Sequence, residues 1–154
     1  KKKFSFFPFV FIFLILFFSS LLFFRSALFS YSYFYFPKNT EKYIVKINDV
    51  LSSVQLPILV ELGHIKMVDF VATIQEETVK FSGVIKNNSL RPILTPRIRI
   101  LAIREDRKIL MEQIIVTKEK IIMPSSTIEF NDFSRINSKE ENISVKAVIL
   151  KKLF

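Results

Sequence analysis

The 154-residue chain contains no cysteine, one histidine and only two glycines. Without cysteine, its residues cannot form disulfides, zinc ribbons, thiol nucleophiles or iron–sulfur clusters. Gly63 and Gly83 are too few for a phosphate-binding loop or a dinucleotide fingerprint, and their scarcity argues against glycine-rich barrels and propellers. The compartment stays open, because a cysteine-free chain suits either side of a membrane.

Phenylalanine, by contrast, is abundant and concentrated near the N-terminus, where residues 1–36 hold 13 of the 18. Residues 4–24 form a run of 21 positions without a charge. A bilayer core of about 30 Å needs about 20 such residues in a helix. We therefore predict one membrane span over about Phe6 to Phe24, followed by an aromatic interface belt in residues 31–36.

The charges beside this run predict its orientation. Lys1, Lys2 and Lys3 precede it, and only Arg25 follows closely, so the positive-inside bias places the N-terminus in the cytoplasm. A cleaved signal peptide is the main alternative, although its apolar region is usually shorter and ends at a small-residue site. A buried core helix would need a polar face, which this run lacks. We expect an uncleaved anchor.

The remaining chain has a mild basic excess, with 19 basic and 14 acidic side chains in residues 36–154. The basic residues alternate with acids instead of gathering in a tract, so nucleic-acid binding is not expected. Pro37 to Thr40 is a polar breaker, after which Thr40 or Asn39 is predicted to cap a short helix over about residues 41–54, ended by Pro57. Its apolar side chains fall on one face: Tyr43, Ile44, Ile47, Val50, Leu51 and Val54.

From Ile65 the apolar pattern changes to a period of two, which is typical of half-buried strands. Six strands are predicted, over residues 65–74, 79–85, 97–104, 109–116, 127–133 and 143–149. In the first strand, one face should carry Val68, Phe70, Ala72 and Ile74. The run Leu101-Ala102-Ile103 interrupts the alternation in the third strand and predicts a bulge or a change of face.

No helical stretches separate these strands, which favours an all-β sandwich over a parallel sheet. The expected organisation has three parts. Residues 1–36 are the anchor with its aromatic belt, residues 37–63 are a linker with the short amphipathic helix, and residues 64–154 are the sandwich domain.

Three strings carry a family resemblance. Residues 79–89 match the pattern v-x-f-x-G-x-I-x-N-x-S, and residues 96–103 supply the next strand. Residues 124–130 match x-P-G-x-x-x-x-F, except that Ser125 replaces the glycine. Over about residues 64–150 the order is similar to membrane-anchored immunoglobulin-like β-sandwich domains of unknown function from bacterial envelope proteins.

The resemblance implies an immunoglobulin-like antiparallel sandwich behind one transmembrane helix, and no known reaction. It also implies a single-pass protein of the bacterial inner membrane with a cytoplasmic N-terminus and a periplasmic C-terminal domain. Many such proteins carry a cytoplasmic zinc ribbon before the span. Because this chain has no cysteine, neither a metal role nor a nucleic-acid role carries over from that ribbon.

Candidate chemistry is sparse. His64 is a lone histidine without a thiol partner, and we predict it to be a structural loop residue. The acidic pairs Glu76-Glu77, Glu105-Asp106 and Glu140-Glu141 each lie in a predicted turn, where carboxylates face solvent. The N-glycosylation motifs at Asn87 and Asn142 are short enough to arise by chance. We expect no catalytic, cofactor or metal site.

Basic residues of the third strand form the most suggestive group. Arg97 and Arg99 share one face of that strand, with Arg104 at its end, and such a face suits acidic groups of a partner or lipid headgroups. A solvated strand face is the simpler interpretation, which we favour.

The expected function is a single-pass membrane protein that presents a β-sandwich to other envelope proteins. The alternative is a membrane-proximal carrier of lipid or another hydrophobic ligand, and an enzyme is the third class. The sequence does not indicate an oligomeric state.

Overall fold

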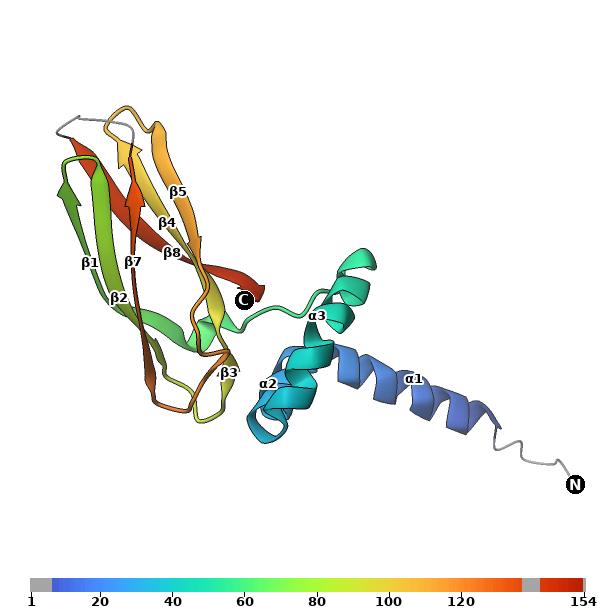
Figure 1. Cartoon of the computed structure of the whole chain (residues 1–154). Helices are drawn as coiled ribbons and strands as arrows, with labels where there is room; N and C mark the ends of the chain where they lie inside the picture. Colours follow the sequence, from blue (N-terminus) through green and yellow to red (C-terminus); the bar gives the residue numbers. More distant parts are fainter. Residues whose placement is uncertain (1–6, 137–141, 154) are drawn as a thin grey trace, which may run out of the picture. The chain divides into compact units, whose positions relative to one another are not determined.

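We analysed a computed structural model of the chain, which describes residues 7–136 and 142–153 (Figure 1). The chain divides into two compact units, Lys1–Ile58 and Leu59–Phe154. We call them the helical unit and the β unit. The division falls between the boundaries expected after residues 36 and 63.

The helical unit contains three helices: α1 (Phe7–Phe23), α2 (Arg25–Tyr35) and α3 (Pro37–Ser53). Every side chain of α1 is exposed, and none carries a charge. α2 packs against α3, where Ser32 Oγ lies 3.0 Å from Thr40 Oγ1. Among residues 7–136 and 142–153, no helix taken alone has both the length and the apolar content to cross a membrane. α1 and α2 meet those criteria jointly, with a 70° bend between them.

The predicted short helix begins earlier than expected. α3 starts at Pro37, and Phe36 occupies the capping position that we assigned to Asn39 or Thr40. Proline is well suited to the first turn because its missing N–H would have no helical partner there. The polar run after Phe36 is therefore the first turn of the helix and not a breaker. Of the predicted apolar face, Ile44 is buried, whereas Tyr43, Ile47, Val50 and Val54 are exposed.

The described residues of the β unit form a 3₁₀ turn, η1 (Leu62–His64), and eight strands. Two of these, β3 (Ile93–Leu94) and β6 (Ile121–Ile122), pair only with each other and were not predicted. The six long strands match the prediction: β1 (Ile65–Gln75), β2 (Thr78–Asn87), β4 (Pro96–Arg104), β5 (Ile109–Ile115), β7 (Thr127–Arg135) and β8 (Ile143–Leu153).

The long strands form two antiparallel sheets of three strands, in the orders β1-β2-β7 and β5-β4-β8. Figure 1 shows these sheets as two layers. Apolar side chains from both layers fill the space between them, and the central strands contribute the most deeply buried: Val79, Phe81, Ile85, Ile98, Ile100 and Ala102. The predicted mainly β, sandwich-like domain is confirmed at this level.

Two irregularities bear on the predicted faces. The register of β4 against β5 shifts between Ala102 and Ile103, but the extra residue is Leu110 of β5. Burial keeps alternating along β4 through Leu101, Ala102 and Ile103, so the bulge or change of face predicted within this strand was wrong. The register of β1 against β2 shifts between Met67 and Asp69, which we did not predict. Because of that shift, Val68 is 59% exposed and does not join Phe70 and Ala72 on the inward face, so its predicted placement was wrong.

Candidate interaction surface

The lone histidine and the acidic pairs do not converge. His64 is exposed, and its backbone carbonyl accepts a hydrogen bond from the Asn88 N–H at 2.8 Å. Glu76 and Glu77 lie exposed in the β1–β2 turn. The pair at 140–141 lies outside the described residues. Within the described ranges, no group of three or more His, Asp or Glu side chains is arranged to hold a metal ion.

The third acidic pair belongs to the β4–β5 turn. Asp106 accepts hydrogen bonds from Arg104 Nε and from the Lys108 backbone N–H, both at 3.0 Å. The hydrogen bond from Arg104, followed by that from Lys108, lowers the pKa of Asp106 from 3.8 to about 2. These bonds close a tight turn in which Arg107 has a φ of 68°. Asp106 and Arg104 are therefore both used in forming the turn.

The predicted basic stripe is divided between two roles. Arg97 and Arg99 lie on the outward face of β4, since the inward positions are Ile98, Ile100 and Ala102. Arg99 Nε lies 3.1 Å from Glu112 Oε1 on the adjacent strand, an ion pair in which both side chains are more than 40% exposed. Arg104 serves the turn instead. Such exposed pairs contribute little stability, so this face is available to solvent or to a partner.

The motif that carried the family resemblance contains a buried polar cluster. Asn87 is fully buried at the end of β2. Its Nδ2 donates to the carbonyl oxygens of Arg91 and Ile122 at 2.8 and 3.0 Å, and its Oδ1 accepts from the Ser89 N–H and Oγ. These bonds satisfy a side-chain amide that would otherwise be costly to bury. The amide nitrogen is also inaccessible, which excludes Asn87 as a glycosylation site.

The two lateral sides of the β unit differ in how well they are sealed. On the side formed by β5 and β7, the inward residues Met111, Ile115, Ile128 and Phe130 are 6–7% exposed. Gln113 Nε2 of β5 donates to Asp132 Oδ2 of β7 at 2.8 Å across the two sheets. We call this the closed side. Sequence reasoning missed this bridge, because the pairing of two polar inward positions depends on the sheet order.

The side formed by β1 and β8 is less sealed. The inward residues Phe70 and Ala72 of β1 and Val145 and Ala147 of β8 are half-buried, and Ile74 is 38% exposed. Their neighbours on β4, Ile100 and Ala102, are completely buried. We call this the open side. On this side, apolar side chains that point between the sheets remain partly exposed to solvent, so the core of the β unit is not fully covered here.

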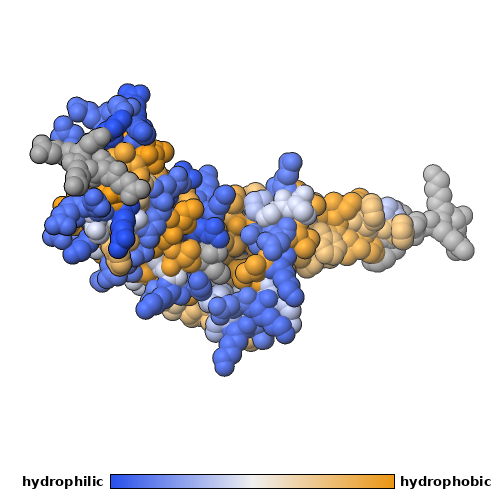
Figure 2. Space-filling view, turned by 45° about the horizontal axis from the view of Figure 1, so that its top comes forward, coloured by the Kyte–Doolittle hydropathy of each residue, from blue (hydrophilic) through white to orange (hydrophobic). Residues whose placement is uncertain are grey.

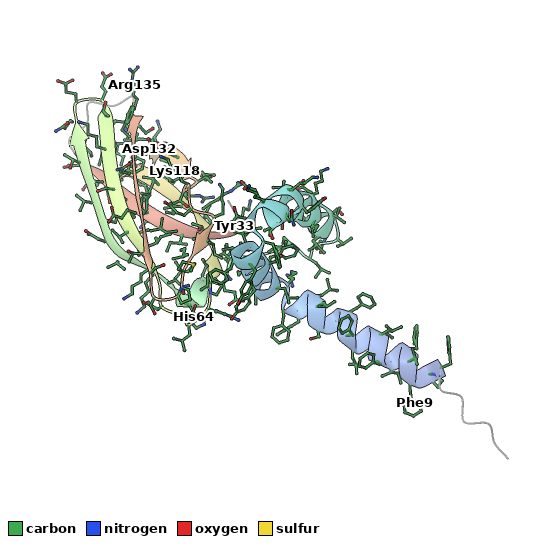
Figure 3. The ribbon with its side chains drawn as sticks, turned by 60° about the horizontal axis from the view of Figure 1, so that its bottom comes forward. Phe9, Tyr33, His64, Lys118, Asp132 and Arg135 are labelled. Carbon is green, nitrogen blue, oxygen red and sulfur yellow. The ribbon has the colours of Figure 1, made fainter. Side chains whose placement is uncertain are left out.

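The described residues also line shallow hollows. One, of about 390 Å³, lies over the sheet β1-β2-β7 and is lined by residues that include Val71, Lys80 and Phe133. The other, of about 490 Å³, lies in the helical unit between α2 and α3 and is lined mainly by apolar and aromatic side chains such as Phe29, Phe36 and Tyr43. Figure 3 shows His64 and Asp132 toward opposite ends of the β unit, so these polar groups form no common site.

No family profile, curated protein or solved structure matches the chain.

Proposed function

We propose that the chain is held in a membrane by the segment around α1 and presents the β unit to other proteins at the cell envelope. The observation that carries this proposal is the exposure of α1, in which 17 residues without a charge have no buried side chain. Figure 2 shows this continuous apolar surface in orange. Apolar patches of this extent mark contacts with a membrane or another protein.

The length of the segment supports a membrane and not a protein groove. Seventeen helical residues extend about 26 Å, and the uncharged run in the sequence covers the 21 positions from 4 to 24. The first charge after the run, Arg25, donates through Nη1 to the Leu22 carbonyl at 2.7 Å and through Nε to the Pro57 carbonyl at 2.8 Å. A guanidinium at the last carbonyls of α1 suits the membrane boundary of such a helix.

The strand order supports an immunoglobulin-like arrangement for the β unit. Immunoglobulin sandwiches pair strands A, B and E in one sheet and strands C and F in the other. The orders β1-β2-β7 and β5-β4-β8 correspond to A-B-E and C′-C-F. Such domains serve many functions, so the proposal of protein contact also depends on the lack of a convergent polar site among the described residues.

The membrane orientation is testable because the chain has no native thiol. Ser5→Cys and Ser82→Cys place single thiols just before the predicted span of about Phe6 to Phe24 and on the exposed face of β2. In spheroplasts, a membrane-impermeant maleimide should label Ser82→Cys at once and Ser5→Cys only after lysis. Labelling of both thiols before lysis, or release of the protein by high salt without detergent, would contradict the membrane anchor.

The lipid-carrier alternative lacks a matching space between the sheets. Ile85, Ile98 and Ile100 are completely buried there, so the interior of the β unit is filled by its own side chains. The apolar hollow between α2 and α3 is the feature that favours a ligand. Native mass spectrometry after gentle extraction separates the two proposals, because a carrier should retain a stoichiometric lipid.

A further inference from the structure

We propose that the free edge of β8 binds an extended peptide segment of a partner protein, in which apolar residues alternate with polar residues that include acids. The proposal rests on the proposed function as a protein-contact domain and specifies where and how that contact is made. It joins three observations at the open side: the backbone of β8, its inward side chains and its charges.

The backbone of β8 offers an unpaired edge. β8 spans 11 residues and pairs with β4, and no other strand of the described ranges pairs with it. In a sheet, alternate residues direct their N–H and C=O groups to opposite edges, so about half of these groups on β8 face away from β4. A long edge strand of this kind is a template for one more strand. At its C-terminal end, the Lys151 carbonyl already accepts from the Val60 N–H at 3.0 Å.

The side chains at this edge leave apolar surface for an added strand to cover. Val145, Ala147 and Ile149 point inward opposite Ala102, Ile100 and Ile98, which are fully buried, yet they stay half-buried themselves. Ile74 and Ala72 are similarly exposed on β1, across the open side. Every second residue of an added strand would point toward these half-buried side chains, so apolar residues must alternate with polar ones.

The charge on β8 selects the polar residues of the partner. Between Ile143 and Leu153 the strand carries Lys146, Lys151 and Lys152 and no acid. Lys146 lies on the part of the edge before the bond to Val60, and Lys151 and Lys152 lie just beyond that part. All three are exposed, which suits an acidic strand and disfavours a basic one. The same charges disfavour a second copy of this chain, because pairing two β8 edges would bring lysines together with no acid on either strand.

The length of the occupant follows from the free part of the edge. Residues 143–150 precede the bond between Lys151 and Val60, and eight extended residues cover about 26 Å. All pairs of long strands in this unit are antiparallel, so the geometry favours an antiparallel addition.

The proposal is tested with the full chain in detergent micelles and a fluorescein-labelled octapeptide of alternating valine and glutamate. Two control peptides alternate valine with lysine, or place four valines before four glutamates. Backbone amide chemical shifts locate the binding site, and fluorescence anisotropy gives the dissociation constant. Lys146→Glu reverses the charge at the edge, and Lys118→Glu makes the same change in the exposed loop after β5.

The alternating valine–glutamate peptide should shift amides of residues 143–150 and leave those of β5 unchanged. Lys146→Glu should weaken binding about tenfold, because it places like charges on paired strands, whereas Lys118→Glu should change it by less than about twofold. Equal binding of the block or lysine peptide, or shifts confined to other strands, would overturn the proposal. A dimer displaced by the peptide would assign the edge to a second copy.

Photo-crosslinking in cells separates failure of this proposal from failure of the proposed function. Crosslinkers are placed at Ser144 on β8 and at Glu112 on β5. A protein captured only from Glu112 would leave the protein-contact function standing and refute the β8 edge. Capture from Ser144 together with a negative membrane-anchor test would support the edge and refute the membrane presentation.

Discussion

The two sides of the β unit use the same kind of inward-facing apolar strand, but they are buried to different depths. On the closed side, Ile128 and Phe130 of β7 are 6% exposed, whereas on the open side Ile74 of β1 is 38% exposed. Both β1 and β7 are edge strands that pair with β2. Each also contacts an edge strand of the opposite layer, β8 for β1 and β5 for β7. The two sides therefore differ in how far these neighbours cover the inward side chains.

Matched isoleucine substitutions test this difference most strongly. Ile128→Ala should lower the free energy of unfolding by about 2–5 kcal/mol, because it opens a cavity in a sealed region. Ile74→Ala should cost roughly 1–2 kcal/mol, because part of that side chain already contacts water. Urea denaturation of the full chain in micelles measures both. Equal losses would show that the two sides are sealed alike.

A glycine beneath Phe130 provides the second test of the closed side. A methyl group at Gly83 would lie 2.5 Å from Phe130 Cζ and 3.0 Å from the Asp69 carbonyl oxygen. Gly83→Ala should destabilise the β unit by about 1–3 kcal/mol, because the buried ring must move. Ser82→Ala, on the exposed face of the same strand, is the control and should change stability by less than about 0.5 kcal/mol. A neutral Gly83→Ala would mean that Phe130 shifts freely.

The polar bridge of the closed side should contribute less. Removing Asp132 leaves Gln113 Nε2 without its 2.8 Å acceptor, and Asp132→Ala should cost about 1 kcal/mol. A double-mutant cycle with Gln113→Ala isolates the interaction, since the second substitution should then have little further effect. Additive losses from the two substitutions would show that the bridge does not join the sheets in solution.

The smallest effect concerns the β4–β5 turn, next to the closed side. The folded-state pKa of Asp106, about 2, is below its ordinary value of 3.8. The ionised form therefore stabilises the turn above about pH 4, and this stabilisation is lost as the pH falls toward 2. Arg104→Gln should move the pKa of Asp106 back toward 3.8 in an NMR titration. An unchanged pKa would assign the shift to the Lys108 N–H alone.

The strands were predictable from the sequence because alternation is local. Phe70 and Ala72 share one face of β1 as expected, and Val79, Phe81 and Ile85 alternate in the same way along the predicted strand β2. The predicted inward placement of Val68 was wrong because a bulge changes which face each residue occupies, and the apolar pattern of the sequence does not reveal that bulge. β3 and β6 are too short for any periodicity to reveal them.

The helical unit was less predictable. Residues 31–36 were expected to be an aromatic belt, and most of them lie in α2, an 11-residue helix that was not predicted and that is bent by 70° from α1. The open side was not predicted either, because strand order decides which inward residues lack a neighbour. Sequence periodicity gives the face of a strand but not the strand beside it.

The Asn87 cluster has a consequence for how the β unit opens. Through one side chain it joins the loop after β2 to Ile122 of β6, so neither segment can leave its place without breaking bonds of the other. The Ser89 amide, which donates to Asn87 Oδ1 at 2.9 Å, should therefore resist hydrogen exchange as strongly as the central strands. Loops that normally fray separately would here unfold as one cooperative unit with the core.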